Sequence, residues 1–184
     1  MSLIEIRPER HGVLLDIVYA TAGNLTGRPI YARPACYLHE EAVAKLERAV
    51  ALACGLGLRL KIFDAFRPPE AQWKLWEFLA DPTFIADPRR GSAHSRGVAV
   101  DLTLVDVAGR ELDMGTGFDA LTPLSYHASM EISEAAQRNR FLLLGLMTAA
   151  DWDFYAYEWW HYQLFDAGLY PMLNDADLPI SMMR

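Results

Sequence analysis

An aspartate stands in the middle of a segment that is otherwise built for burial. Residues 98–104 read VAVDLTL, so apolar side chains lie on both faces of the expected strand around Asp101. Burying an ionised carboxylate costs several kcal/mol unless a cation, a metal ion or several hydrogen bonds offset the lost hydration. The sequence should therefore contain a partner for Asp101.

Two histidines and a second acid could complete a metal site around this aspartate. His94 is separated from Asp101 by a loop-like stretch in which Gly97 can bend the backbone and let both side chains face one point. Far along the chain, the letters EWWH supply Glu158 and His161. Two histidines and one carboxylate form a three-ligand set that suits zinc, with water in the fourth position. Glu158 is then the spare carboxylate that a zinc hydrolase needs to take a proton from water.

A cation is also needed where negative charge develops on a substrate carbonyl. Arg67 is a candidate because its guanidinium keeps its charge when buried, but on spacing it could equally form a structural salt bridge with Asp64. Taken alone, His94 could be a hydrogen-bonded core or surface residue and Glu158 an exposed strand residue. The remaining histidines have no patterned partner, and we expect them at the surface or in loops: His11, His39 and His127.

The elements that must position these residues follow from hydrophobic periodicity. Strands are expected at 13–19, 58–63, 98–104, 110–114 and 154–165, and helices at 40–54, 70–80 and 134–150. Pro69 suits the first turn of the second helix, and Ser133 is a plausible cap for the third. Residues 81–92 are rich in turn formers. Strands and helices without a regular βαβ rhythm predict an α+β fold with a central antiparallel sheet.

Length and composition limit the classes of function. A chain of 184 residues with 52% hydrophobic residues predicts one domain, residues 1–184, around one core. A net charge of -7 argues against a nucleic-acid partner, and no apolar run approaches a membrane span. The charged N-terminal segment does not have the apolar run of a signal peptide, so we expect a cytoplasmic protein. Cys36 and Cys54 lack metal-site spacing and are interpreted as reduced structural thiols.

Two motifs and their order indicate a family. The letters SAHSRGVAVD match the pattern S-x-H-x-x-G-x-A-x-D, and EWWH matches the second motif of the same family. The chain resembles the D-alanyl-D-alanine dipeptidases of the vancomycin-resistance type, which belong to the zinc D-Ala-D-Ala metallopeptidases. One departure is Tyr126 after Ser125, where relatives often have a histidine, so the contribution of that loop to a substrate pocket is left open. Further matching segments are YATAGNLTG (19–27), FDAFRP (63–68), MGTGFD (114–119), AAQRNR (135–140) and EWWHY (158–162).

The resemblance implies a role for each candidate residue of the reaction centre. His94, Asp101 and His161 would ligate one zinc ion per chain, Glu158 would act as the general base, and Arg67 would stabilise the tetrahedral intermediate. It also implies an α+β fold in which helices flank a central antiparallel sheet that carries the metal. The implied reaction is hydrolysis of free D-alanyl-D-alanine to two D-alanines.

The resemblance further implies how a small dipeptide is held. Asp119 and Tyr19 would bind its free amino group. Ser92 is not part of this implication, but it lies near enough to His94 to offer its hydroxyl to the other end. An acid that must pair with an ammonium selects a free dipeptide over a blocked one. Two alternatives remain open: a D,D-carboxypeptidase or peptidoglycan endopeptidase with the same metal set, and a zinc-stabilised binding module without catalysis. The sequence does not indicate the oligomeric state.

Overall fold

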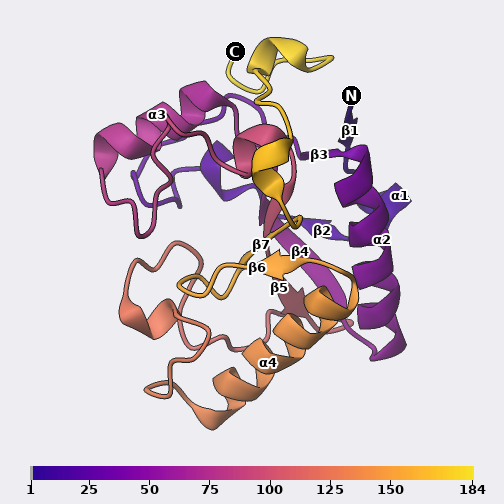
Figure 1. Ribbon diagram of the computed structural model, residues 1–184. Coiled ribbons are helices and arrows are strands. Elements are labelled where there is room, and N and C mark those ends of the chain that lie inside the picture. Colours follow the sequence, from indigo (N-terminus) through magenta and orange to yellow (C-terminus); the bar gives the residue numbers. More distant parts are fainter. Residues whose placement is uncertain (1) are drawn as a thin grey trace.

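The computed structural model describes residues 2–184 and builds them around a mixed five-stranded sheet (Figure 1). The strand order is β2-β4-β5-β7-β6, in which the strands span Leu14–Leu15, Arg59–Asp64, Ala99–Val105, His161–Gln163 and Asp153–Phe154, respectively. A separate pair joins β1 (Leu3–Glu5) to β3 (Tyr37–His39). The expected α+β class is confirmed.

The central sheet is not wholly antiparallel, as the sequence had led us to expect. Strands β4, β5, β7 and β6 pair antiparallel, but β2 runs parallel to β4. Parallel neighbours need a crossover connection, and here the chain between them passes through β3 and the long helix α2. The edge of the sheet therefore departs from the expectation, while its centre agrees with it.

The longer helices begin within one residue of the positions that the sequence predicts. They are α2 (Glu40–Gly55), α3 (Pro69–Phe78) and α4 (Glu134–Ala149), whereas the short helix α1 (Pro8–His11) was not predicted. Helices α2 and α4 contact each other and the sheet, whereas α3 lies apart from them at the other end of the molecule (Figure 1). Pro69 occupies the first turn of α3, and the Ser133 hydroxyl accepts a hydrogen bond from the Ala136 amide at the start of α4. No helix among residues 2–184 has the length and apolar character that a membrane crossing requires.

Three expected strands are shorter or broken. The segment 13–19 forms only β2 and then a 3-10 turn at Val18–Ala20, and 110–114 contributes a single bridge, Val105 to Glu111. The aromatic run 154–165 is a β6–β7 hairpin whose turn interrupts the pairing, not one strand. In the segments 13–19 and 154–165, the backbone turns at a point from which a side chain enters the cavity described below.

The three histidines assigned to the surface or to loops are all buried. His11 lies at the end of α1, where its ring bonds the backbone of Arg7. His39 caps α2 by accepting from the Glu41 amide, and His127 lies in a loop but packs beneath Phe154. Because histidine is not a typical capping residue, no sequence pattern predicted the capping role of His39.

Candidate metal centre and active site

The ladder of the central sheet places three ionisable side chains in one row. Asp101 of β5 pairs with Asp64 of β4 on one side and with His161 of β7 on the other. Directly paired residues of neighbouring strands point to the same face of a sheet. A register shift between Ile62 and Asp64 is essential here, because without it Phe63 would stand opposite Asp101 and Asp64 would point to the other face.

His94 reaches the same point from a short turn that precedes β5. The 3-10 turn His94–Arg96 ends at Gly97, whose left-handed backbone (φ 69°) redirects the chain into the strand. A side chain at this glycine would also collide with Leu3, since a Cβ atom would lie 2.5 Å from its Cδ2 atom. Gly97 therefore has the bending role that the sequence indicated.

The ligand cluster, as we call His94, Asp101 and His161, is closely spaced and buried. His94 Nε2 lies 3.1 Å from His161 Nδ1 and 3.3 Å from Asp101 Oδ1, and His161 Nδ1 lies 3.1 Å from that same oxygen. Ligands of a tetrahedral metal with bonds of roughly 2.0–2.1 Å are separated by about 3.3 Å. The spacing of the three atoms thus fits a small divalent cation.

Hydrogen bonds on the outer side of the cluster fix which ring nitrogens face the centre. His94 Nδ1 lies 2.7 Å from the carbonyl of Ala65, and His161 Nε2 lies 3.2 Å from Gln163 Oε1. Both partners are acceptors, so each imidazole donates outward and, in its neutral form, turns an unprotonated nitrogen toward Asp101. Three electron-pair donors then face one another, an arrangement that a bound cation stabilises.

Arg67 joins the cluster to the rest of the site. Its Nη2 donates to Asp101 Oδ2 at 3.2 Å, its Nε to Asp64 Oδ2 at 2.8 Å and its Nη1 to Gln72 Oε1 at 3.1 Å. The structural salt bridge with Asp64 that the sequence left open is thus present, and Arg67 also lines the cavity. Burial alone would raise the pKa of Asp101, but the positive charges of His94 and His161 in their protonated forms and the hydrogen bonds that these rings then donate outweigh it and hold that pKa well below its usual range.

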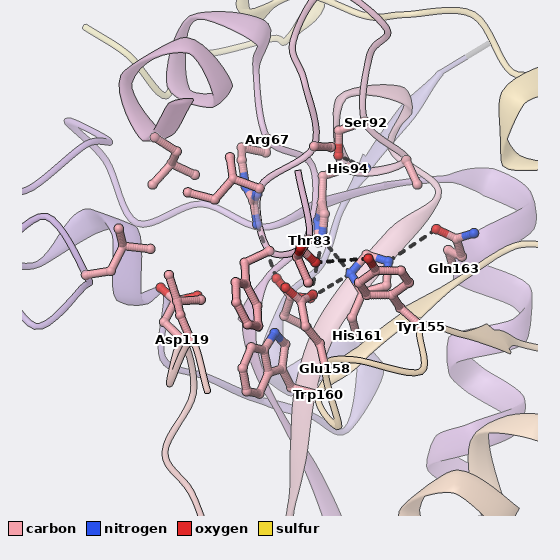
Figure 2. A pocket seen from close by; sticks show the side chains of 18 of the residues that line it. Arg67, Thr83, Ser92, His94, Asp119, Tyr155, Glu158, Trp160, His161 and Gln163 are labelled. Atoms are coloured by element: carbon pink, nitrogen blue, oxygen red, sulfur yellow. Dashed lines mark hydrogen bonds and ion pairs between the residues drawn. The ribbon is translucent and has the colours of Figure 1, made fainter. Parts of the chain in front are cut away.

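A cavity of about 290 Å³ lies over the ligand cluster (Figure 2). Glu158, on the turn between β6 and β7, lines it and is 8% exposed, and its carboxylate makes no hydrogen bond to any residue between 2 and 184. Burial raises the pKa of Glu158 to about 8, with Asp101 and Asp119 adding to the effect and His161 opposing it. A carboxyl group in this environment can take up and return a proton near neutral pH.

The residues expected to bind a substrate also border the cavity. Tyr19 donates to Asp119 Oδ1 at 3.0 Å, whereas Asp119 Oδ2 is buried without a partner among residues 2–184. Asp119 has a left-handed backbone (φ 59°), a strained conformation often found at functional sites. Ser92 accepts from the His94 amide at 3.2 Å, which leaves its own proton free to be donated. Figure 2 shows Asp119 on one side of the cluster and Ser92 on another, next to His94.

Several residues of the site were not identified from the sequence. Ala65, Gln72 and Gln163 orient the ligands or Arg67, and Tyr155 lines the cavity. Of these, only Gln163 carried a usable signal, because it lies two residues after His161 and so on the same face of β7.

Other residues of interest lie outside the site. Tyr126, whose role the sequence left open, does not line the cavity and packs its ring against Tyr157. Cys36 is buried and Cys54 exposed, and neither belongs to the ligand cluster.

Comparison with known proteins identifies first the class and then the family. A family model described as D-ala-D-ala dipeptidase matches residues 2–178, nearly the whole chain, and places the protein among the peptidases. The chain belongs to the D-Ala-D-Ala dipeptidase family.

Individual relatives agree with this assignment. The chain is similar to the D-alanyl-D-alanine dipeptidase of Escherichia coli, with 44% identity over 161 residues that cover 88% of this chain and 83% of the relative. It is 32% identical to the D-alanyl-D-alanine dipeptidase of Enterococcus faecalis, over 85% of this chain and 88% of the relative. For the D-alanyl-D-alanine dipeptidase of Streptomyces coelicolor the identity is 33%, over 83% and 86% of the two chains.

Proposed function

We propose that this protein hydrolyses free D-alanyl-D-alanine to two D-alanines with one zinc ion held by His94, Asp101 and His161. The observation that supports this most directly is the ligand cluster, in which three potential ligand atoms lie 3.1–3.3 Å apart beneath a cavity. Two imidazoles and one carboxylate are a ligand set typical of catalytic zinc, and they leave a fourth position for water or substrate. The names of the relatives supply the substrate.

Glu158 is the residue we assign as general base. When bound, zinc would lower the pKa of a coordinated water and polarise the scissile carbonyl. The Glu158 carboxylate has no competing hydrogen bond among residues 2–184 and can therefore accept the proton of the attacking water. The same carboxyl group then returns that proton to the leaving amine.

Arg67 is assigned to stabilise the negative charge that develops on the carbonyl oxygen. Its three hydrogen bonds to Asp64, Asp101 and Gln72 fix the guanidinium at the cavity wall, so little reorganisation is needed during the reaction. The guanidinium also stacks on the Tyr19 ring, with its Cζ atom 4.9 Å from the ring centroid, and this contact further restricts its position.

Asp119 and Tyr19 are assigned to the amino group of the dipeptide. The unpartnered Asp119 Oδ2 needs a donor, and an ammonium group supplies one. Ser92 is assigned to the opposite end of the substrate, where its free hydroxyl proton can bind a carboxylate. A blocked or lengthened amino end would leave the Asp119 carboxylate buried without its partner.

Metal content and substrate selectivity, measured on one sample, test this proposal. We expect about one zinc per chain and a much higher kcat/KM for D-Ala-D-Ala than for N-acetyl-D-Ala-D-Ala. Equal or better turnover of the acetylated substrate would favour a D,D-carboxypeptidase or endopeptidase instead. Bound zinc without hydrolysis of either substrate would favour a binding module.

A further inference from the structure

A turn-rich segment of the chain forms one wall of the cavity. Residues 82–86 and 91–93 line it, and we call residues 82–92 the rim segment. Backbone bonds within the segment are local, since the amides of Phe84 and Ile85 both bond the carbonyl of Asp81. Ile85 is buried in the hydrophobic core and anchors the segment, whereas Arg89 and Arg90 are exposed.

Apart from the adjoining Asp81, whose carboxylate accepts from the Thr83 amide, two side chains within residues 2–184 bond the backbone of the rim segment from elsewhere in the chain. Gln72 donates from Nε2 to the carbonyl of Ala86 at 2.7 Å, and Tyr155 donates from its hydroxyl to the carbonyl of Thr83 at 2.9 Å. The first tether begins on the residue that also accepts from Arg67. The second begins on the β6–β7 turn, which also carries Glu158. Both tethers thus connect the rim segment to elements that carry reacting groups.

The tether from Tyr155 begins on the far side of the ligand cluster from Asp119. Figure 2 shows Asp119 on one side of the cluster and Tyr155 on the other, next to His161, with Thr83 drawn over the cluster between them. A dipeptide whose amino group meets Asp119 and whose peptide bond lies over the cluster must therefore point its carboxyl end toward this part of the wall. Asp119 can reject extension of the amino end, but it cannot reject a longer carboxyl end.

We propose that Tyr155 is a positioning residue that holds the rim segment in place and thereby limits the length of the substrate at its carboxyl end. The length limit rests on the proposed function, whereas the tether itself does not. Removing the hydroxyl frees the carbonyl of Thr83 and lets residues 82–86 move away from the cavity. The aromatic ring of Tyr155, which packs against His161, remains in the Tyr155→Phe variant.

Hydrogen exchange without substrate tests the tether. In Tyr155→Phe, we expect the amides of residues 83–86 to exchange roughly 2- to 10-fold faster than in the wild type, the factor that one neutral hydrogen bond is worth. Tyr157→Phe is the matched control, since Tyr157 is 43% exposed and does not line the cavity. Unchanged exchange in Tyr155→Phe, or an equal rise in the control, would overturn the tether.

The length limit is tested with D-Ala-D-Ala and D-Ala-D-Ala-D-Ala, which share a free amino end and differ at the carboxyl end. In Tyr155→Phe, we expect the kcat/KM for the dipeptide divided by that for the tripeptide to fall by a factor similar to the increase in exchange. In Tyr157→Phe, this ratio should stay constant. Faster exchange with an unchanged ratio would overturn the length limit. A loss of both activities by more than about 100-fold with unchanged exchange would make Tyr155 a catalytic group instead. If the wild-type protein does not hydrolyse the dipeptide, both the proposed function and the length limit are contradicted. The hydrogen-exchange experiment would still test whether Tyr155 holds the rim segment.

Discussion

At the scale of single residues, the site separates groups that hold a metal from groups that move protons. The cluster atoms of His94, Asp101 and His161 face one another, while the Glu158 carboxylate faces the cavity without a hydrogen bond to residues 2–184. If this separation is correct, changing Glu158 affects turnover and changing His161 affects metal binding.

The first prediction concerns Glu158→Gln. Glutamine keeps the size and polarity of the side chain but cannot accept a proton, so kcat should fall by at least about 100-fold with zinc retained at one per chain. His161→Gln, as the matched variant, should lose the metal. The measurements are kcat with D-Ala-D-Ala and zinc by elemental analysis. Loss of zinc in Glu158→Gln would make Glu158 a ligand, and near-normal kcat would place the base elsewhere.

The second prediction concerns the cost of holding Asp119 in the cavity. Burial raises the pKa of Asp119 to about 7, an effect that Arg67 opposes. Because the unfolded pKa is about 3.9, the folded state binds more protons between those two values, so stability falls as pH rises from about 4 to about 7. Asp119→Asn removes this titration, keeps an acceptor for Tyr19 and tolerates the left-handed backbone.

The metal-free Asp119→Asn variant should therefore be more stable than metal-free wild type at pH 8, by a few kcal/mol, with the difference shrinking toward pH 4. Urea unfolding at several pH values measures it. At the same time the variant should lose selectivity for the free over the acetylated dipeptide. A constant stability difference across pH would mean that Asp119 does not titrate in this range.

At the scale of elements, periodicity predicts what the core alone determines. Strand β5 and helices α2 and α4 lie within a residue or two of their expected bounds, because continuous or amphipathic burial leaves a clear pattern. The hairpin at 153–163 was expected as one strand, because an aromatic run carries no signal for a turn. That turn presents Glu158 to the cavity, so the site overrides local strand propensity there.

The candidate site was predictable to a different extent. Spacing alone suggested His94 and Asp101, but the approach of His161 depends on β5–β7 pairing, which no local pattern encodes. The resemblance to a family supplied that link. Contacts made through backbone carbonyls, such as those of Ala65 and Thr83, leave no mark in the sequence, since any residue carries a carbonyl.

The third prediction concerns the loop that carries Asp119. Arg140 of α4 is buried and donates to the carbonyls of Met114, Leu124 and Tyr126, at 2.7–2.8 Å. Lysine cannot reproduce this planar set of donors, so Arg140→Lys should destabilise the protein by roughly 2–4 kcal/mol and raise KM.

Arg138→Lys on the same helix is the control for that substitution. Its side chain is 78% exposed and, among residues 2–184, pairs only with Glu134, one turn away, so the change should stay within about 0.5 kcal/mol. Chemical denaturation and KM measured on both variants check the prediction. Equal stability of the two variants would show that the loop is held without Arg140.

At the scale of the whole molecule, the ligand cluster lies where separate parts of the chain meet. His94 comes from the turn before β5, Asp101 from the central strand β5 and His161 from the start of β7, just after the β6–β7 turn. Within residues 2–184, acidic groups outnumber the one guanidinium that lines the cavity, since Asp101, Asp119 and Glu158 line it together with Arg67, and Asp64 also pairs with Arg67. A divalent cation would both offset this excess charge and connect these parts of the chain.

The last prediction follows from that arrangement. A ligand that binds only the folded state stabilises it by about 4 kcal/mol at 1,000 times its Kd, and for a chain of this size each kcal/mol raises Tm by roughly 2–4 °C. Zinc should therefore raise Tm by roughly 8–16 °C at that excess, and a chelator should reverse the shift. If residues 2–184 form one domain, calorimetry should show a single transition before and after zinc. His161→Gln should remove most of the shift while Glu158→Gln keeps it, because only the first replaces a ligand. An equal shift in wild type and His161→Gln would mean that zinc binds elsewhere, and two separate transitions would contradict the single domain.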